Sequence, residues 1–205
     1  MRKILTSIII LCALIGGMTA NAQFRYGPTA GADITTLKFK QNLIGVGQSV
    51  GFSAGVQGEL MFPGIGFGID IGLRYEQRGA KLHLGDKPIW ASEGYGVERT
   101  YLHYLDIPFH LRFKYTRLNG VENTIAPFVY AGPTFSILMG HNKIEALKYA
   151  GGELGIEVGA GAEIFRNWQL SGAYTWGMTY ALKTRQLTDF SAHSRTWDIR
   201  LTYFF

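Results

Sequence analysis

The chain has 205 residues, of which 20 are Lys or Arg and 15 are Asp or Glu, with 27 glycines, 6 prolines and 1 cysteine. The formal net charge of +5 is small and dispersed along the chain, which argues against a nucleic-acid partner. A lone cysteine excludes a disulfide within the chain. The length suits one domain, and no linker-like or low-complexity segment divides it.

The first 22 residues are predicted to be a secretory signal peptide. Arg2 and Lys3 precede an apolar run over 4–18, and small residues at Ala20 and Ala22 suit a cleavage site. The run is shorter than the ~20 residues of a spanning helix, although an N-terminal anchor helix is the alternative. A lipoprotein is disfavoured because the only cysteine, Cys12, follows Leu11 and not a small residue. Cleavage leaves 23–205, with 18 basic residues against 15 acidic ones.

Eight stretches of the remaining chain alternate apolar and polar residues with a period of two, which predicts β-strands with one apolar and one polar face. No long stretch follows a 3.6-residue period, so the class is all-β. The facing of the fifth stretch is left open, because Phe128 and Tyr130 alternate with Val129 and Ala131. In chain order the predicted strands cover 24–34, 50–62, 65–75, 101–115, 125–139, 154–164, 168–180 and 197–205.

The last strand places large apolar side chains on one face and mostly polar ones on the other. Its end on an exposed apolar row is typical of a strand that faces lipid, and it is expected to pair with the first strand and close a barrel. A terminal Phe after alternating apolar residues resembles the signal by which the outer-membrane assembly machinery recognises β-barrel substrates. The predicted assembly signal is Trp197, Ile199, Leu201, Tyr203 and Phe205.

Two patterns favour a membrane barrel. Connections after the second, fourth and sixth strands are short and the others longer, as when short periplasmic turns alternate with long outer loops and both termini lie in the periplasm. Ten residues of a tilted strand rise about 25 Å, the height of the apolar band of a membrane barrel. A soluble barrel such as a lipocalin also alternates, with its faces exchanged, and is the alternative.

Residue choice on the polar face distinguishes the two. It consists of glycines and single charges, as over 66–72 and 155–163, where a solvated face would be dense in Lys, Glu and Thr. Small residues beside opposed charges suit a narrow interior that side chains fill. The prediction is therefore an eight-stranded antiparallel transmembrane β-barrel over 23–205, located in the outer membrane.

Charged residues on the inward faces have nearly equal numbers of both signs. Each charge in a confined interior needs a partner, so we interpret them as a network of ion pairs, with a catalytic acid/base pair as the alternative. Eight strands leave no room for a pore. The predicted lumen network comprises Arg25, Glu59, Asp70, Arg74, Asp106, Arg112, Glu157, Glu163, Asp198 and Arg200, together with Glu76, Glu153 and Lys114.

No catalytic, cofactor or metal site is predicted. The five histidines lack metal-ligand spacing: three lie in predicted outer loops, and His103 and His110 lie on opposite faces of one strand. Ser191 and His193 near the rim suit an outer-membrane lipid hydrolase, but no supporting acid accompanies them. A barrel-embedded lipid-modifying enzyme is therefore only an alternative.

Three segments resemble the PorT-type outer-membrane barrel domain that is common in Bacteroidetes. They are YLDIPFHLRFKY at 104–115, APFVYAGPTFSILMG at 126–140 and LGIEVGAGAEI at 154–164, and the NAQ at the signal junction matches as well. The resemblance implies a membrane barrel with no catalytic residues. Some members take part in type IX protein secretion, so a secretion-system component is an alternative function.

Function is placed in the outer loops, above all in the connection over 77–100. Strands are dictated by lipid and lumen, so recognition is left to loops, and Trp and Tyr beside basic residues anchor interfaces. A basic rim suits lipopolysaccharide phosphates or acidic sugars, and other envelope proteins are further possible partners. The alternative is that this segment merely extends the strands. The loop candidates are Lys81, Lys87, Trp90 and Tyr95, supported by Lys38, Lys40, Lys143, Lys148, Lys183 and Arg185.

Overall fold

The computed structural model describes residues 23–39, 45–62, 66–83, 97–115, 124–142, 147–184 and 191–205. In these ranges the chain forms ten β-strands, eight of them long. The same ranges contain no helix that is long and apolar enough to cross a membrane. The long strands are β1 (Gln23–Phe39), β2 (Gly45–Met61), β3 (Phe67–His83), β4 (Val97–Lys114), β5 (Ile125–His141), β7 (Gly152–Ile164), β8 (Trp168–Gly177) and β10 (Ser191–Tyr203).

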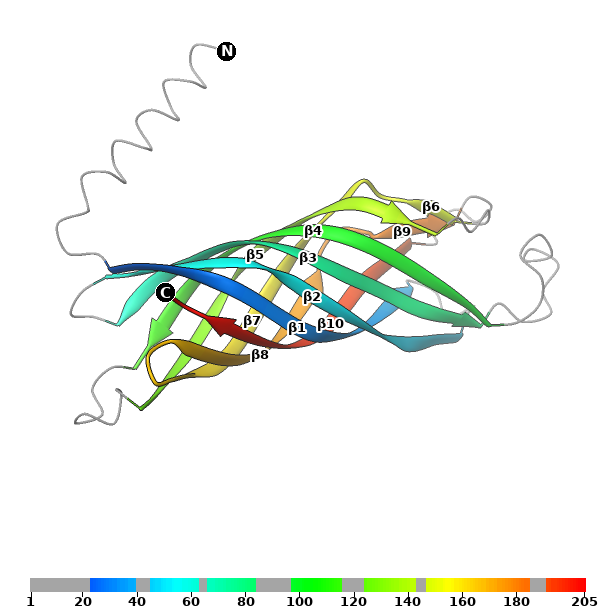
Figure 1. Cartoon of the computed structure of the whole chain (residues 1–205). Helices are drawn as coiled ribbons and strands as arrows, with labels where there is room; N and C mark the ends of the chain where they lie inside the picture. Colours follow the sequence, from blue (N-terminus) through cyan, green and yellow to red (C-terminus); the bar gives the residue numbers. More distant parts are fainter. Residues whose placement is uncertain are drawn as a thin grey trace, which may run out of the picture.

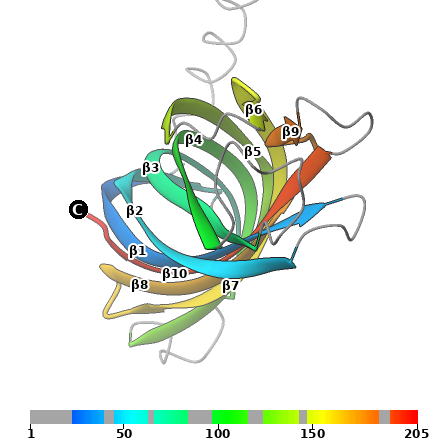
Figure 2. The same ribbon diagram turned by 90° about the vertical axis from the view of Figure 1, so that its right-hand side faces the viewer.

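The long strands form one closed antiparallel barrel (Figures 1 and 2). Each pairs with the next, and β10 pairs with β1, which confirms the predicted closure by the last strand. The register partners can be followed from strand to strand once around the barrel. The path that starts at Ile34 on β1 returns to β1 at Phe24, so the strands are staggered by ten residues over one turn of the barrel. Eight strands with this stagger tilt by about 40° from the barrel axis.

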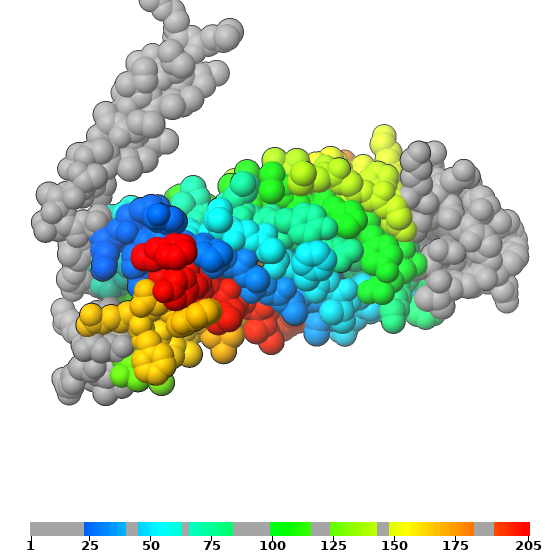
Figure 3. Space-filling model, viewed as in Figure 1, coloured from blue at the N-terminus to red at the C-terminus, as the bar shows by residue number. Residues whose placement is uncertain are grey.

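The strands are longer than a membrane requires. β1, β2, β3 and β5 have 17 residues each and β4 has 18. A tilted strand of this length rises about 40 Å, against roughly 25 Å for the apolar band. Figure 3 shows the elongated body from the side. We call the end with Gln23 and Phe205 the termini end and the opposite end the loop end.

The predicted strands stop short at the loop end. β3 runs to His83 and β4 begins at Val97, so the connection predicted over 77–100 is confined to 84–96. Five residues separate β1 from β2, fewer than the ten between Lys114 and Ile125, so the predicted alternation of short and long connections is wrong here. The prediction followed outward apolar residues, which stop where lipid stops, whereas strand pairing continues beyond them.

Two short strands extend the sheet at the loop end (Figure 1). β9 (Leu182–Thr184) pairs with β10, and β6 (Leu147–Tyr149) pairs with β9. Parts of the predicted loops after β5 and β8 are therefore strand.

The open question about β5 is resolved by two glycines on β7. Phe128 and Tyr130 face inward and are buried, while Val129 is 51% exposed on the outside. Their partners in the register are Gly161 and Gly159. A Cβ on Gly159 would lie 2.3 Å from the ring of Tyr130, and one on Gly161 would lie 2.7 Å from the ring of Phe128. The glycine-rich face of β7 thus makes room for two inward aromatic rings.

Candidate functional site

The barrel separates its charges by face. Among the side chains that the structure describes, nine carboxylates and six basic groups point into the lumen, an excess of three acids, while those that point outward include six basic residues and no acid. All ten residues predicted for the lumen network face inward and make ion pairs. The outward basic residues are Lys38, Lys81, Arg99, Lys148, Arg166 and Arg195.

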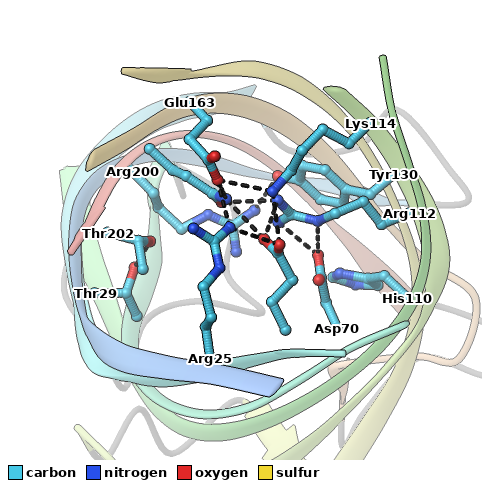
Figure 4. Close-up of polar contacts among 12 residues, drawn as sticks. Arg25, Thr29, Asp70, His110, Arg112, Lys114, Tyr130, Glu163, Arg200 and Thr202 are labelled. Atoms are coloured by element: carbon cyan, nitrogen blue, oxygen red, sulfur yellow. Dashed lines mark hydrogen bonds and ion pairs between the residues drawn. The ribbon is translucent and has the colours of Figure 1, made fainter. Parts of the chain in front are cut away.

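Figure 4 labels Arg25, Lys114 and Glu163 among the ion pairs nearest the termini end. These ion pairs centre on Glu59, which has no exposed surface. Its carboxylate accepts hydrogen bonds from Lys114 at 2.6 Å, Arg25 at 2.7 Å and Arg112 at 2.9 Å. Arg25 and Lys114 also reach Glu163, at 2.5 and 2.7 Å. These residues come from β1, β2, β4 and β7, so the ion pairs cross the lumen and join opposite walls.

Aromatic rings and an amide complete this layer. Arg112 lies 4.1 Å from the ring centroid of Phe128 and forms an ion pair with Asp70 at 2.6 Å. Gln169 donates to Glu59 at 2.7 Å. The ring of Phe204 is fully buried, with the guanidinium of Arg25 5.1 Å from its centroid. The polar layer is therefore closed by a ring at the termini end.

A second group of ion pairs occupies the middle of the lumen. Arg74 and Arg200 both contact Glu157, the former at 2.7 Å. Arg200 also pairs with Asp198 at 2.8 Å and donates to the hydroxyl of Tyr130 at 2.5 Å. Two bases and two acids balance here.

A third group, toward the loop end, centres on Arg78, which falls within the outer connection predicted over 77–100. That placement is wrong: Arg78 is buried and pairs with Asp106 at 2.6 Å, Glu76 at 2.7 Å and Glu153 at 3.4 Å. The even numbering that it shares with Asp70, Arg74 and Glu76 on β3 is the signal that could have revealed it. Asp33, near this level, accepts from Ser53 at 3.3 Å. The excess of acids lies in this group.

Beyond the third group the lumen becomes apolar. This feature has no counterpart in the sequence prediction of a packed polar lumen. We call it the apolar plug; Val46 and Tyr149 pack against it. It consists of Leu37, Phe39, Ala80, Leu82, Ala181, Leu182 and Ala192.

Little free space remains in the charged part of the lumen. A cavity lined by Asp70, Arg74, His110 and Tyr130, among others, has a volume of about 10 Å³, enough for about one water molecule. Each carboxylate of the ion pairs described above contacts a basic side chain. Two carboxylates also accept from serine hydroxyls: Glu153 from Ser194 at 2.5 Å and Asp33 from Ser53 at 3.3 Å. Among the residues that the structure describes, no group of three or more His, Cys, Asp or Glu side chains is placed to hold a metal ion.

The predicted assembly residues lie on the outer face of β10 and just beyond it. Trp197, Ile199, Leu201 and Phe205 are 62%, 65%, 45% and 68% exposed. The amide of Phe205 donates to the carbonyl of Tyr26 at 3.0 Å, beyond the end of the strand. Tyr203 contacts Phe205, with ring centroids 5.3 Å apart. Their role in assembly stays a prediction.

The loop candidates are only partly visible. Lys81 lies in β3 and is exposed, and Lys38 and Lys148 are exposed on β1 and β6. Ser191 and His193, considered for a hydrolase, both face outward on β10. Outside the described residues lie Lys87, Trp90, Tyr95, Lys40, Lys143, Arg185, the side chain of Lys183 and the predicted signal peptide 1–22.

Comparisons with known proteins agree with this architecture. OprG of Pseudomonas aeruginosa is similar in fold, with a TM-score of 0.51 at 12% identity over 90% of this chain and 95% of that one. Neisserial surface protein A gives a TM-score of 0.47 at 13% identity over 88% and 98% of the two chains. Ail of Yersinia pestis, solved with the heparin analogue sucrose octasulfate, gives 0.45 at 13% identity over 89% and 99%.

At 12% identity the likeness to OprG shows the fold alone, and no curated protein matches the chain. The family model described as "Outer membrane protein beta-barrel domain" matches residues 19–182, most of the chain. The chain therefore belongs to this family of β-barrel domains, and the protein is an eight-stranded barrel of the outer membrane.

Proposed function

We propose that the protein is a non-enzymatic, non-conducting barrel that acts in the cell envelope through its loop end. One observation carries the proposal: the lumen is crossed by ion pairs and closed by the apolar plug. A solute that crossed the barrel would have to separate these ion pairs and displace the side chains of the apolar plug.

The cross-lumen ion pairs are costly to open. Glu59 holds basic residues from β1 and β4 with no exposed surface, and removal of one partner of a buried pair costs roughly 3–5 kcal/mol. A transport cycle that opened the lumen would have to separate several such pairs at once. The interior therefore serves stability.

What remains for function is the part that projects beyond the membrane. The strands exceed the apolar band by roughly 15 Å, so the ends of β3 and β4 that flank 84–96 stand away from the membrane surface on a rigid support. The charged outward side chains described there, including Lys81 and Arg99, are all basic. Partners with phosphate or acidic-sugar groups, or acidic faces of envelope proteins, suit that charge.

The proposal is tested in two steps. Reconstituted in planar bilayers beside a known porin as control, the protein should give no stable conductance; porin-sized steps would contradict it. In cells, replacement of 84–96 by a short Gly-Ser turn leaves the register pair His83–Val97 in place, so the barrel should fold while envelope phenotypes of the null mutant appear. A folded, shortened barrel that restores every phenotype would remove the loop from the proposal.

A role in protein secretion is the second candidate, supported by the resemblance of 104–115 and 126–140 to PorT-type barrels. It predicts that secreted cargo accumulates in the periplasm of the null mutant. Normal cargo export would exclude it and leave the first proposal intact.

A further inference from the structure

A group of polar and basic side chains stands on the outer wall where β1, β8 and β10 meet. Lys38 and His193 are register partners, and Arg195 is the register partner of both Thr36 and Trp176. The guanidinium of Arg195 lies 5.2 Å from the ring centroid of Trp176. Lys38 is exposed, and His193 and Arg195 are half-buried.

Three aromatic side chains adjoin this group: Trp176 lies beside its register partner Arg195, and Tyr174 and Trp197 lie two residues nearer the termini end on β8 and β10. Trp197 follows Arg195 by two residues on the same outward face of β10. Its ring centroid is 4.7 Å from that of Tyr174, which is 5.5 Å from Trp176. Outward residues of β10 thus pass from Leu201 and Ile199 through a Trp to an Arg. That order is typical of the boundary between the apolar band and the headgroups.

The aromatic side chains border an apolar groove of about 760 Å³ on the lipid-facing wall. Small outward residues form its floor: Ala131 on β5, Ala160 on β7 and Gly172 on β8. Trp176 and Trp197 stand at its loop-end side, and Leu111 and Phe113 border it on β4, nearer the termini end. A groove of this size accommodates acyl chains.

We propose that this wall is a binding site for an anionic, phosphate-bearing lipid of the membrane leaflet at the loop end. Acyl chains lie in the groove beside Trp176 and Trp197, and the phosphate is contacted by Arg195, His193 and Lys38. Charge-assisted hydrogen bonds to phosphate are among the stronger polar contacts, and stacking on Trp176 holds the guanidinium at the boundary.

Charge selects a lipid over a second copy of the chain. The outward side chains that the structure describes include no carboxylate, so a second copy would bring like charge against Lys38 and Arg195. The site rests on wall residues and not on the 84–96 connection, so it stands or falls independently of the proposed function.

The test measures lipids retained by the folded mature barrel. The protein is placed in phosphatidylcholine nanodiscs, diphosphoryl lipid A or its dephosphorylated form is titrated in, and native mass spectrometry counts bound lipids. A triple variant, K38Q with H193Q and R195Q, should bind diphosphoryl lipid A about tenfold more weakly. The dephosphorylated lipid should bind weakly to every variant.

A groove variant tests the acyl half of the site. Gly172→Leu fills the floor, and only the carbonyl of Asp198, at 3.8 Å, lies within 4 Å of an added Cβ, so the backbone tolerates it. This variant should reduce binding of both lipids. Heat-modified gel mobility verifies that each variant is folded.

The matched control is R166Q, which removes an outward basic side chain at the termini end, away from both the groove and the loop end. It should bind like the parent chain. Equal loss in this control would mean general charge attraction and overturn the site. Undiminished binding in the triple variant, equal binding of dephosphorylated lipid, or unchanged binding by Gly172→Leu would each overturn it as well.

Discussion

Two parts of the same strands carry opposite arrangements of polarity. In the membrane part of β1, Ile34 faces outward and Asp33 faces the lumen; a few residues on, Lys38 faces outward and Leu37 faces the lumen. The alternation is unbroken, but its faces are exchanged. A period of two therefore reports only that two faces differ, and the surroundings, lipid or water, decide which face is apolar.

The barrel interior differs in the same way on the two sides of the boundary between apolar band and headgroups. On the side toward the termini end it is held by ion pairs such as those of Glu59, and on the side toward the loop end by the apolar plug. The chain thus combines a membrane barrel with a short loop-end part whose apolar interior and polar outside resemble those of a water-soluble barrel. The following predictions test where the exchange occurs and what each interior contributes.

The largest effect is expected for chemical labelling across the boundary. Residues 23–205 contain no cysteine, so Ile34→Cys and Lys38→Cys each introduce one thiol on the same outward face of β1. A charged, membrane-impermeant maleimide added to intact cells should label position 38 and spare position 34, because a lipid-covered thiol is inaccessible. Labelling of both, or labelling of position 38 only after cell lysis, would contradict the proposed boundary or orientation.

The next largest effect concerns the centre of the polar interior. Glu59→Leu leaves Arg25, Arg112 and Lys114 close together without their shared acid, and should lower the free energy of unfolding by about 3–5 kcal/mol. Urea unfolding in lipid vesicles measures it. Lys81→Gln, on the outer wall, serves as control and should stay within about 0.5 kcal/mol. Equal stability of the two variants would mean that the ion pairs do not support the barrel.

A smaller loss is expected in the apolar plug. Leu82 is fully buried, and Leu82→Ala should destabilise the barrel by roughly 2–3 kcal/mol, toward the low end for core leucines because a strand end can relax. The same urea titration applies. The outward neighbour His83, changed to Ala, should have little effect. If both substitutions were neutral, the plug would not be a packed core.

The smallest effect tests the fit between β5 and β7. Gly159→Ala forces a Cβ against the ring of Tyr130, and overpacking of this kind costs about 1–3 kcal/mol. Tyr130→Leu should remove most of that penalty in the double variant, which a double-mutant cycle detects. Additive losses would show that the two residues do not clash.

The barrel itself was predictable from the sequence, because lipid dictates one whole face of each strand. The closing strand with Ile199 and Leu201 outward is the clearest case, and the inward acids and bases follow from the same alternation. The signal peptide and the loop residues Lys87, Trp90 and Tyr95 stay predictions.

Two features of the structure could not be predicted from the sequence, for a physical reason. Past the boundary no lipid selects apolar outward residues, so Arg78 and Leu82 were assigned to a loop although they continue the inward face of β3. On β5, aromatic rings occupy the inward face because glycines lie opposite them on the neighbouring strand. Such compensation between strands is invisible within either strand alone.

The ion pairs across the lumen have a consequence for how the barrel closes. They unite residues as distant in sequence as Arg25 and Glu163, so they cannot form while β1 and β10 are still apart. A slip of one residue in any strand turns its charges toward lipid and leaves their partners without a counter-charge. When β1 and β10 pair, only the native register brings all of these charges to their partners. The network therefore favours the native register over registers shifted by one residue during assembly.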